Sequence, residues 1–277
     1  MVLIADCGST KIDWCVLNGD KLEKRFFSTG VNALLMPEEK IRETFEKELA
    51  PEVKDFSIDE VYYYGAGCLS DEICSNVSRS IAACVPGAKT ISVNSDLLAA
   101  ARALCGTEPG IACILGTGSN SCLCRDGEIL KNVPPLGYVL GDEGSGAVLG
   151  RNLVNGIFKG HIPLKEEFLA AHGLNYEEII RRVYREPYAN RFLASFAPFI
   201  RAHIDRPEIR ELVLRSFRDF ASRNLSRYPA ELPVSLLGGV AAHFEALLRE
   251  ALEAEGRRVE TIVESPAEGL LKYHYGR

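Results

Sequence analysis

The chain has 277 residues, of which 47% are hydrophobic and 25% are charged, and its formal net charge is −6. This composition is that of a folded globular protein long enough for two domains with separate cores. The acidic balance without a basic run argues against nucleic acid as a partner, and no apolar stretch reaches the roughly 20 residues of a membrane span. The nine cysteines include no C-x-x-C pair, and the chain opens on a strand pattern without a signal peptide. We therefore expect a cytoplasmic protein.

The first predicted element is a hairpin with a small hydroxyl-rich turn. An apolar strand ends at Asp6, a Gly-Ser turn follows at residues 8–9, and a second apolar run begins at Ile12. The second run ends in an Asn-Gly turn at residues 18–19, and a third predicted strand extends from there to Phe27. Asn-Gly between apolar runs is a strong hairpin signal, so the sequence predicts antiparallel strands here.

Alternating helices and strands fill the rest of the first half. Hydrophobic periodicity predicts helices over 37–49, 71–83 and 97–104, and strands over 58–65 and 89–93. This alternation is typical of an α/β domain. The glycine- and proline-rich segment 106–110 is a natural boundary, so we expect domains over residues 1–108 and 109–277.

The hairpin pattern returns at the start of the second half. An apolar strand is predicted over 111–115, followed by a Gly-Thr-Gly-Ser turn at 116–119. A second strand is predicted over 121–124, and it ends in an Asp-Gly turn at 126–127. Glycine allows a close approach of backbone to a ligand, and successive N–H groups bind anions. Two such turns favour phosphate as a ligand, although ordinary β-turns use the same residues. The P-loop and dinucleotide-binding glycine patterns do not occur in the sequence.

The remaining pattern is mainly helical. A glycine-rich stretch over 137–150 leads into predicted helices as far as residue 228. Phenylalanines recur there at near-helical spacing, and we expect them to lie in the hydrophobic core. We also expect this segment to form a dimer surface. The last predicted elements are a strand over 234–237 before Gly-Gly, a helix over 241–255, a strand over 259–263 and a helix over 267–272.

Several motifs, in this order, resemble the BadF/BadG/BcrA/BcrD-type ATPase and N-acetylglucosamine kinase family, part of the superfamily of actin, sugar kinases and heat-shock chaperones. They are Ala-Asp-Cys-Gly-Ser-Thr-Lys-Ile-Asp-Trp at 5–14, Asp96, Leu-Gly-Thr-Gly-Ser at 115–119, Gly-Asp-Glu-Gly-Ser-Gly at 141–146 and Leu-Gly-Gly-Val at 237–240. The resemblance implies an α/β, two-domain actin-like ATPase (ribonuclease H-like) fold. A β-β-β-α-β-α-β-α unit would occur twice, once in each domain, with a cleft between the two domains. Domain 109–277 would carry a helical insertion, and its last helix could pack back on domain 1–108.

The resemblance also implies roles for individual residues. Asp6 would hold Mg²⁺, mostly through water, and Asp96 would be the catalytic base. ATP would be held by two phosphate loops and an adenosine segment, namely Gly8, Ser9, Thr10, Lys11, Gly116, Thr117, Gly118, Ser119, Gly238 and Gly239. The sugar hydroxyls would be held by Asn32, Asn120 and Asp142, and we add the neighbouring Glu143. Cys7 stands where relatives commonly have glycine, which leaves the geometry of the first loop open.

Other interpretations of these residues stay open. Aspartate directly before a helix is a good N-cap, so Asp96 fits that role as well as the role of a base. Asp142 and Glu143 stand in a glycine-rich turn, where carboxylates are often turn residues.

The implied activity is ATP-dependent phosphoryl transfer to a hydroxyl of an amino sugar by a homodimeric enzyme. N-acetylglucosamine is the first candidate, and the sequence alone leaves open which amino sugar and which hydroxyl take part. One alternative is an ATPase activator of a reductive dehydratase, although the cysteines are scattered where a cluster-binding pair would be needed. Another is a non-catalytic sugar-sensing protein of the same fold.

Overall fold

The computed structural model describes residues 1–8 and 11–276, and in it the chain folds into two compact units. Unit 1 consists of Met1–Thr107 together with Pro266–Arg277, and unit 2 of Glu108–Ser265. The last helix thus belongs to the same unit as the first strand. Ser9 and Thr10, which the sequence assigns to the first phosphate loop, lie outside the described residues.

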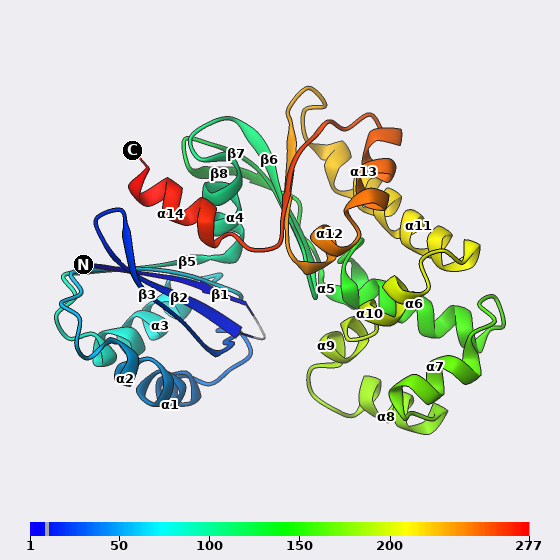
Figure 1. The fold of residues 1–277 in the computed structure, drawn as a ribbon, viewed down its shortest axis with the longest axis horizontal. Coiled ribbons are helices and arrows are strands. Elements are labelled where there is room, and N and C mark those ends of the chain that lie inside the picture. The colour runs from blue at the N-terminus through cyan, green and yellow to red at the C-terminus, as the bar shows by residue number, and fades with distance from the viewer. Residues whose placement is uncertain (9–10, 277) are drawn as a thin grey trace. The chain divides into compact units, whose positions relative to one another are not determined.

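Unit 1 is a mixed five-stranded sheet in the order β3-β2-β1-β4-β5. Its first three strands are antiparallel neighbours, whereas β1, β4 and β5 run parallel. In Figure 1, α1, α2 and α3 lie on one side of this sheet and α4 and α14 on the other. The elements are β1 (Val2–Cys7), β2 (Lys11–Asn18), β3 (Lys21–Thr29), α1 (Glu38–Glu48), α2 (Ala50–Val53), β4 (Glu60–Gly65), α3 (Asp71–Cys84), β5 (Thr90–Ser95), α4 (Asp96–Cys105) and α14 (Ala267–Tyr275).

The core of unit 1 is built around Trp14 on β2. Its ring is fully buried and packs against Phe26, Phe45 and Tyr63. The indole N–H donates to the hydroxyl of Ser28 at 2.8 Å, so burial of the ring leaves its polar group with a partner. Trp14 is therefore a core residue of unit 1.

Unit 2 repeats the arrangement of unit 1 with the strand order β8-β7-β6-β9-β10. Asp126 and Gly127 both have positive φ (54° and 73°), as a two-residue hairpin turn between β7 and β8 requires. The elements are β6 (Gly110–Leu115), β7 (Ser119–Arg125), β8 (Glu128–Asn132), α5 (Gly137–Leu140), α6 (Gly146–Phe158), α7 (Lys165–His172), α8 (Tyr176–Tyr184), α9 (Ala189–Ala194), α10 (Ala197–Ala202), α11 (Pro207–Arg223), η1 (Leu225–Arg227), β9 (Val234–Leu237), α12 (Gly239–His243), α13 (Glu245–Ala254) and β10 (Val259–Val263).

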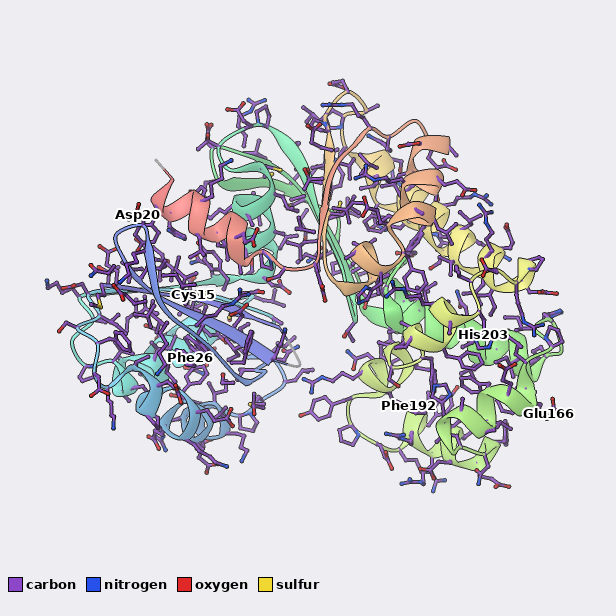
Figure 2. All side chains as sticks on the ribbon, in the orientation of Figure 1. Cys15, Asp20, Phe26, Glu166, Phe192 and His203 are labelled. Atoms are coloured by element: carbon purple, nitrogen blue, oxygen red, sulfur yellow. The ribbon has the colours of Figure 1, made fainter. Side chains whose placement is uncertain are left out.

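The long helical part of unit 2, α6 to α11, shares one apolar core with β6 and β9. The phenylalanines at residues 192, 196, 199, 217 and 220 are all buried in it, so the prediction that they are core residues is confirmed. Phe26 and Phe192 mark the cores of the two units in Figure 2. The repeated strand order confirms the predicted α/β class and the duplication.

None of the helices formed by residues 1–8 and 11–276 is both long enough and apolar enough to cross a bilayer.

Candidate functional site

Two carboxylates lie side by side where the first hairpin of unit 1 opens. Asp6 at the end of β1 is directly opposite Asp13 on β2, so both side chains lie on the same face of the sheet. Burial, together with the charges of Asp13 and Asp96, raises the pKa of Asp6 to about 7, and Lys11 acts in the opposite direction. Among the described residues, the Asp6 carboxylate has no hydrogen bond and no ion pair. The charge of Lys11 thus partly offsets that of Asp6, but within residues 1–8 and 11–276 no cation is bonded to this carboxylate.

Asp13, in contrast, has a firm partner. It is buried, and the Arg25 guanidinium on β3 donates two bonds to it, Nε to Oδ1 at 2.9 Å and Nη2 to Oδ2 at 2.6 Å. Such a two-point pair fixes geometry as well as charge. The sequence analysis assigned no role to this pair, although a charged residue inside the apolar run of β2 was a signal that could have pointed to it.

Asp96 is the first residue of α4, directly after β5. The helix is capped by Ser95, whose hydroxyl accepts from the Leu98 amide at 3.2 Å. The alternative that Asp96 is the N-cap is therefore wrong, because Ser95 already has that role. Asp96 is half-buried as a residue, and burial raises the pKa of its carboxyl group although backbone N–H groups at the helix start oppose the shift. Asp96 is thus available to a ligand.

The predicted sugar ligand Asn32 stands in a turn joined to the end of β1. Residue 66 links them, since its amide donates to Cys7 O at 3.1 Å and its carbonyl accepts from the amide of residue 33 at 3.0 Å. The Asn32 side-chain oxygen accepts from the Leu34 amide at 3.1 Å. The Cys7 side chain is buried and its Sγ donates to Val31 O, so a cysteine fits at this position of the first loop.

In unit 2 the second turn, residues 116–119, lies against the start of α6. The amide of Gly146 donates to Gly116 O at 2.8 Å, and that of Ala147 to Thr117 O at 3.1 Å. The turn itself is closed by a bond from Gly116 N–H to Gly118 O at 2.9 Å. The helix start therefore holds the carbonyls of this turn in place.

Asp142 reaches the same turn from the other side. Its carboxylate accepts from the Ser119 amide, and a Cβ on Gly118 would lie 3.0 Å from its Oδ2. Asp142 is buried and has a left-handed backbone (φ 52°), and burial raises its pKa to about 6, with a smaller contribution from Glu143. Asp142 and the predicted second phosphate loop thus form one local site.

Glu143 and Asn120 have other partners. The Glu143 carboxylate lies 3.5 Å from Arg223 on α11, accepts from Asn224 at 3.3 Å, and lines a pocket of about 160 Å³ next to α6 and α11. The structure therefore does not bring this carboxylate to the turn that Asp142 contacts. The Asn120 side-chain oxygen accepts from the Ser121 amide at 2.9 Å and from Asn132 at 2.8 Å. A sugar would have to use the side-chain amide nitrogen of Asn120.

Gly238 brings the predicted adenosine segment to the second turn. Its φ is +116°, and a Cβ there would lie 2.4 Å from Leu115 O and 3.3 Å from Gly116 N. Only glycine allows the start of α12 to approach the end of β6 this closely. Unit 2 therefore brings together the 116–119 turn, Asp142 and the segment at 238–239.

No group of three or more His, Cys, Asp or Glu residues arranged to hold a metal ion occurs in the part of the chain that the structure describes. Mg²⁺ needs no such group, because it usually keeps several waters and is bound through one or two carboxylates and substrate phosphates. Asp6 fits that donor set, because it lies beside a second carboxylate and no cation is bonded to it among the described residues.

No family model matches the chain, and no curated protein matches it. Solved structures do match it over nearly its whole length. A ROK hexokinase from Thermus thermophilus covers 98% of this chain and 96% of its own at 18% identity, with a TM-score of 0.55. MreB 5 of Spiroplasma citri, in a structure bound to AMPPNP, covers 99% of this chain and 94% of its own at 11% identity, with a TM-score of 0.55. The fold is therefore the actin-like ATPase fold.

A more similar structure defines the family. It is a protein from Porphyromonas gingivalis named putative N-acetylglucosamine kinase, which is 44% identical over 100% of this chain and 99% of its own, with a TM-score of 0.97. A Chromobacterium violaceum protein of the same name has 22% identity, 98% coverage of both chains and a TM-score of 0.75. Identity of 44% over the full length shows that the chain belongs to the N-acetylglucosamine-kinase-like family, and the resemblance inferred from its motifs is confirmed.

Proposed function

We propose that this protein is an ATP-dependent kinase that transfers the γ-phosphate of ATP to a hydroxyl of an amino sugar, with N-acetylglucosamine as the first candidate. The family supports the reaction class, since the relative at 44% identity carries that name. The observation in the structure that carries the proposal is the pair of accessible carboxylates, Asp6 and Asp96, at the ends of β1 and β5. Parallel strands of α/β sheets present ligand sites at their carboxyl ends.

Asp96 is the proposed base. Its carboxylate accepts the proton of the sugar hydroxyl as that oxygen attacks the γ-phosphorus, and the bond from phosphorus to the bridging oxygen of ADP breaks. A carboxylate whose pKa is raised by burial is a stronger base than an exposed one, so the environment of Asp96 suits this step.

ATP is held, in this proposal, by backbone and hydroxyl groups of both units. In unit 1 the phosphates would be bound by Gly8, Ser9, Thr10 and Lys11, and in unit 2 by residues 116–119. The segment at 238–239 would lie along the adenosine, where the absence of side chains lets the nucleotide approach the backbone. Asp6 would hold Mg²⁺, which when bound neutralises charge on the transferred phosphate. That both units act on one ligand remains a prediction of the family resemblance.

The sugar is held, in this proposal, by Asn32, Asn120 and Asp142, with Glu143 as a further candidate. Asp142 is the best supported, since it is buried and fixed by the Ser119 amide. Fixed acceptors select hydroxyls, because an analogue without the hydroxyl leaves a buried polar group unpaired. The net charge of −6 fits a small sugar better than a nucleic acid, and a cytoplasmic homodimer remains part of the proposal.

The test is an ADP-release assay with Mg²⁺-ATP and a panel of amino sugars, hexoses and no sugar. We expect one amino sugar to stimulate ADP release strongly, and Asp96→Asn to lower kcat by about 10²- to 10⁴-fold. Asp71→Asn is a matched control, because Asp71 is likewise the first residue of a helix capped by a serine, Ser70. It should leave turnover unchanged.

Three results would contradict the proposal. ADP release at the same rate with and without every sugar would exclude a sugar kinase. Full turnover in the Asp96→Asn variant would exclude Asp96 as the base. Binding of sugar and ATP without any turnover would favour the non-catalytic sensor instead.

A further inference from the structure

The side chains of Asn120 on β7 and Asn132 at the end of β8 lie on the same face of the unit 2 sheet. In the register of these two strands Asn132 is opposite Cys122, which is two residues from Asn120. Residues two apart in a strand have side chains on the same face, so the two asparagines are diagonal neighbours. Asn120 directly follows the 116–119 turn, whereas the sequence analysis gave Asn132 no role.

Backbone groups fix the orientation of both side-chain amides. The Ser121 N–H donates to Asn120 Oδ1 at 2.9 Å, and a backbone N–H only donates, so the Asn120 oxygen must lie there. Nδ2 of Asn132 donates to Ser121 O at 2.7 Å and to Val133 O at 3.1 Å, and both carbonyls only accept. The same Nδ2 donates to Asn120 Oδ1 at 2.8 Å. Reversing either amide would therefore set donor against donor or acceptor against acceptor.

Tyr228 holds the backbone on both sides of this pair. Its buried hydroxyl donates to Ser121 O at 2.9 Å and accepts from the Val133 N–H at 3.0 Å. Burial raises the pKa of Tyr228 to about 12, so the hydroxyl keeps its proton and its donated bond at neutral pH. The buried Arg257 donates to Tyr228 O at 3.2 Å. The acceptors that Asn132 uses are thus fixed from within unit 2.

The amide nitrogen is the end of Asn120 that this arrangement leaves to a ligand. Asn120 is half-buried, and within residues 1–8 and 11–276 no group accepts from its Nδ2. Its oxygen, in contrast, already accepts two hydrogen bonds, which is the full capacity of an amide oxygen. A ligand at Asn120 therefore meets two N–H donors and no acceptor.

We propose that Asn132 is a positioning residue of the sugar site, which holds the Asn120 oxygen toward β8 so that Asn120 meets the sugar only as a hydrogen-bond donor. This role rests on the proposed function, in which Asn120 binds the sugar. The sugar group at Asn120 is then an acceptor, such as a hydroxyl oxygen or the carbonyl of an N-acyl group. An ammonium group only donates, so a free amino group is disfavoured at this position.

The test compares two variants of Asn132 that separate orientation from packing. Asn132→Asp keeps the shape of the side chain but only accepts, so it should draw the Asn120 NH₂ group toward itself and away from the sugar. Asn132→Leu neither donates nor accepts, so the Ser121 N–H alone still orients Asn120. We expect the Kd of N-acetylglucosamine, measured by calorimetry without ATP, to rise about tenfold in Asn132→Asp and about two- to threefold in Asn132→Leu. A residue that only fills space would give the opposite order, because aspartate is the isosteric replacement.

Kinetics and a double variant show whether Asn132 acts through Asn120. In Asn132→Asp the KM for the sugar should rise, whereas kcat and the KM for ATP should stay within about twofold of the wild type. In an Asn120→Ala background Asn132→Asp should weaken sugar binding no further. Asn155→Asp is the matched control, because it adds the same charge at an exposed position of α6, and it should leave the Kd of the sugar unchanged.

Proton exchange of the side-chain amides, measured by NMR on the ligand-free protein, tests the orientation without any sugar. In the wild type the NH₂ group of Asn132 should exchange about tenfold more slowly than that of Asn120, because only the former is hydrogen-bonded. In Asn132→Asp the NH₂ group of Asn120 should become the protected one. Equal exchange of the two groups in the wild type would overturn the proposed role of Asn132.

The binding results separate this proposal from the proposed function. Sugar binding that Asn132→Asp leaves unchanged would overturn the role of Asn132 while the kinase assignment stands. A further loss of binding from Asn132→Asp in the Asn120→Ala background would also overturn it, because Asn132 would then act by another route. A wild type that binds neither N-acetylglucosamine nor any other sugar of the panel would overturn the proposed function itself.

Discussion

The two units share one hairpin topology, and a backbone bond closes the turn in each, from Gly8 N–H to Lys11 O and from Gly116 N–H to Gly118 O, but the surroundings of the two turns differ. In unit 1, Asp6 lies opposite Asp13, whereas the equivalent cross-strand pair at the end of β6 is Ile114 opposite Asn120. The first turn thus lies among charges, with Arg25 on Asp13 and no cation partner for Asp6 among the described residues. The second turn has no such charged pair at the end of β6, and its carbonyls accept from the amides at the start of α6.

The difference shows that the two copies of a duplicated motif can have different surroundings. A turn beside a carboxylate such as Asp6, which has no bonded cation among the described residues, suits a cation. A turn formed by glycines and fixed carbonyls suits groups that must lie close to the backbone. Unit 1 should therefore be sensitive to changes of charge, and unit 2 to changes of side-chain volume. The predictions below test that contrast.

The largest expected effect is on the close approach at the end of β6. Gly238→Ala would place a Cβ 2.4 Å from Leu115 O at a φ of +116°. The left-handed backbone costs about 1–2 kcal/mol and the forced displacement about 1–3 kcal/mol more. We expect the variant to lose about 4 kcal/mol in the free energy of unfolding, measured by urea denaturation without ligands.

Two alanine variants sharpen this prediction. Gly239→Ala is the matched control, because nothing lies within 4 Å of its Cβ position. Gly8→Ala in the first turn meets Lys11 O at an ordinary 3.5 Å. Both should change stability by less than about 1 kcal/mol. A cost for Gly8→Ala equal to that for Gly238→Ala would remove the contrast between the turns.

The second prediction concerns the buried carboxylate of unit 2. Burial raises the pKa of Asp142 from its ordinary 3.8 to about 6, so the folded state binds more protons than the unfolded state between these pH values. The free energy of unfolding of the wild type therefore falls as pH rises from about 4 to about 6, by at most about 3 kcal/mol from this group. Asparagine suits the left-handed backbone at this position. The Asp142→Asn variant should therefore lack this pH dependence of the free energy of unfolding, and it should be more stable than the wild type at pH 8.

The measurement is denaturation of the wild type and the Asp142→Asn variant across pH 4 to 8 without ligands. The two curves should converge near pH 4 and separate towards pH 6. A constant difference across the range would mean that the Asp142 carboxyl does not titrate there. A less stable variant at pH 8 would show that the bond from the Ser119 amide outweighs the cost of burial.

Most of the fold could be predicted from the sequence because its signals are local. The Asn-Gly and Asp-Gly turns predict both hairpins, and the structure has β2–β3 and β7–β8 joined at these turns. The helical periodicity of the apolar residues and the positions of the helix-breaking residues located α1, α3 and α4 to within one or two residues. The return of α14 to unit 1 depends on packing between segments far apart in sequence, and local pattern carries only a hint of such packing.

Less of the candidate site could be predicted from the sequence, because its geometry depends on which residues of neighbouring strands lie opposite each other. The sequence placed Asp6 and Asp96 at strand ends, and the structure agrees on those positions. Their roles remain predictions. Ser95 as the cap of α4 was missed because two neighbouring residues both suit that position. The Asp13–Arg25 pair depends on the register of β2 and β3, which the sequence does not state.

The smallest expected effect concerns that missed pair. Arg25→Ala would leave the buried Asp13 carboxylate without its cation. Removing one partner of a fully buried pair costs about 3–5 kcal/mol, and because the Arg25 side chain is 43% exposed we expect about 2 kcal/mol. Urea denaturation at pH 7.5 measures this loss.

The double variant Asp13→Asn with Arg25→Ala separates charge from packing. The neutral amide that replaces the Asp13 carboxylate needs no cation and does not repel Asp6, so the double variant should be more stable than Arg25→Ala alone. If the cost of Arg25→Ala came from the packing of its side chain over Phe27, the second change would restore nothing. Equal stability of the single and double variants would therefore show that the first turn does not depend on charge. The division between a charged turn in unit 1 and a close-packed turn in unit 2 would then fail.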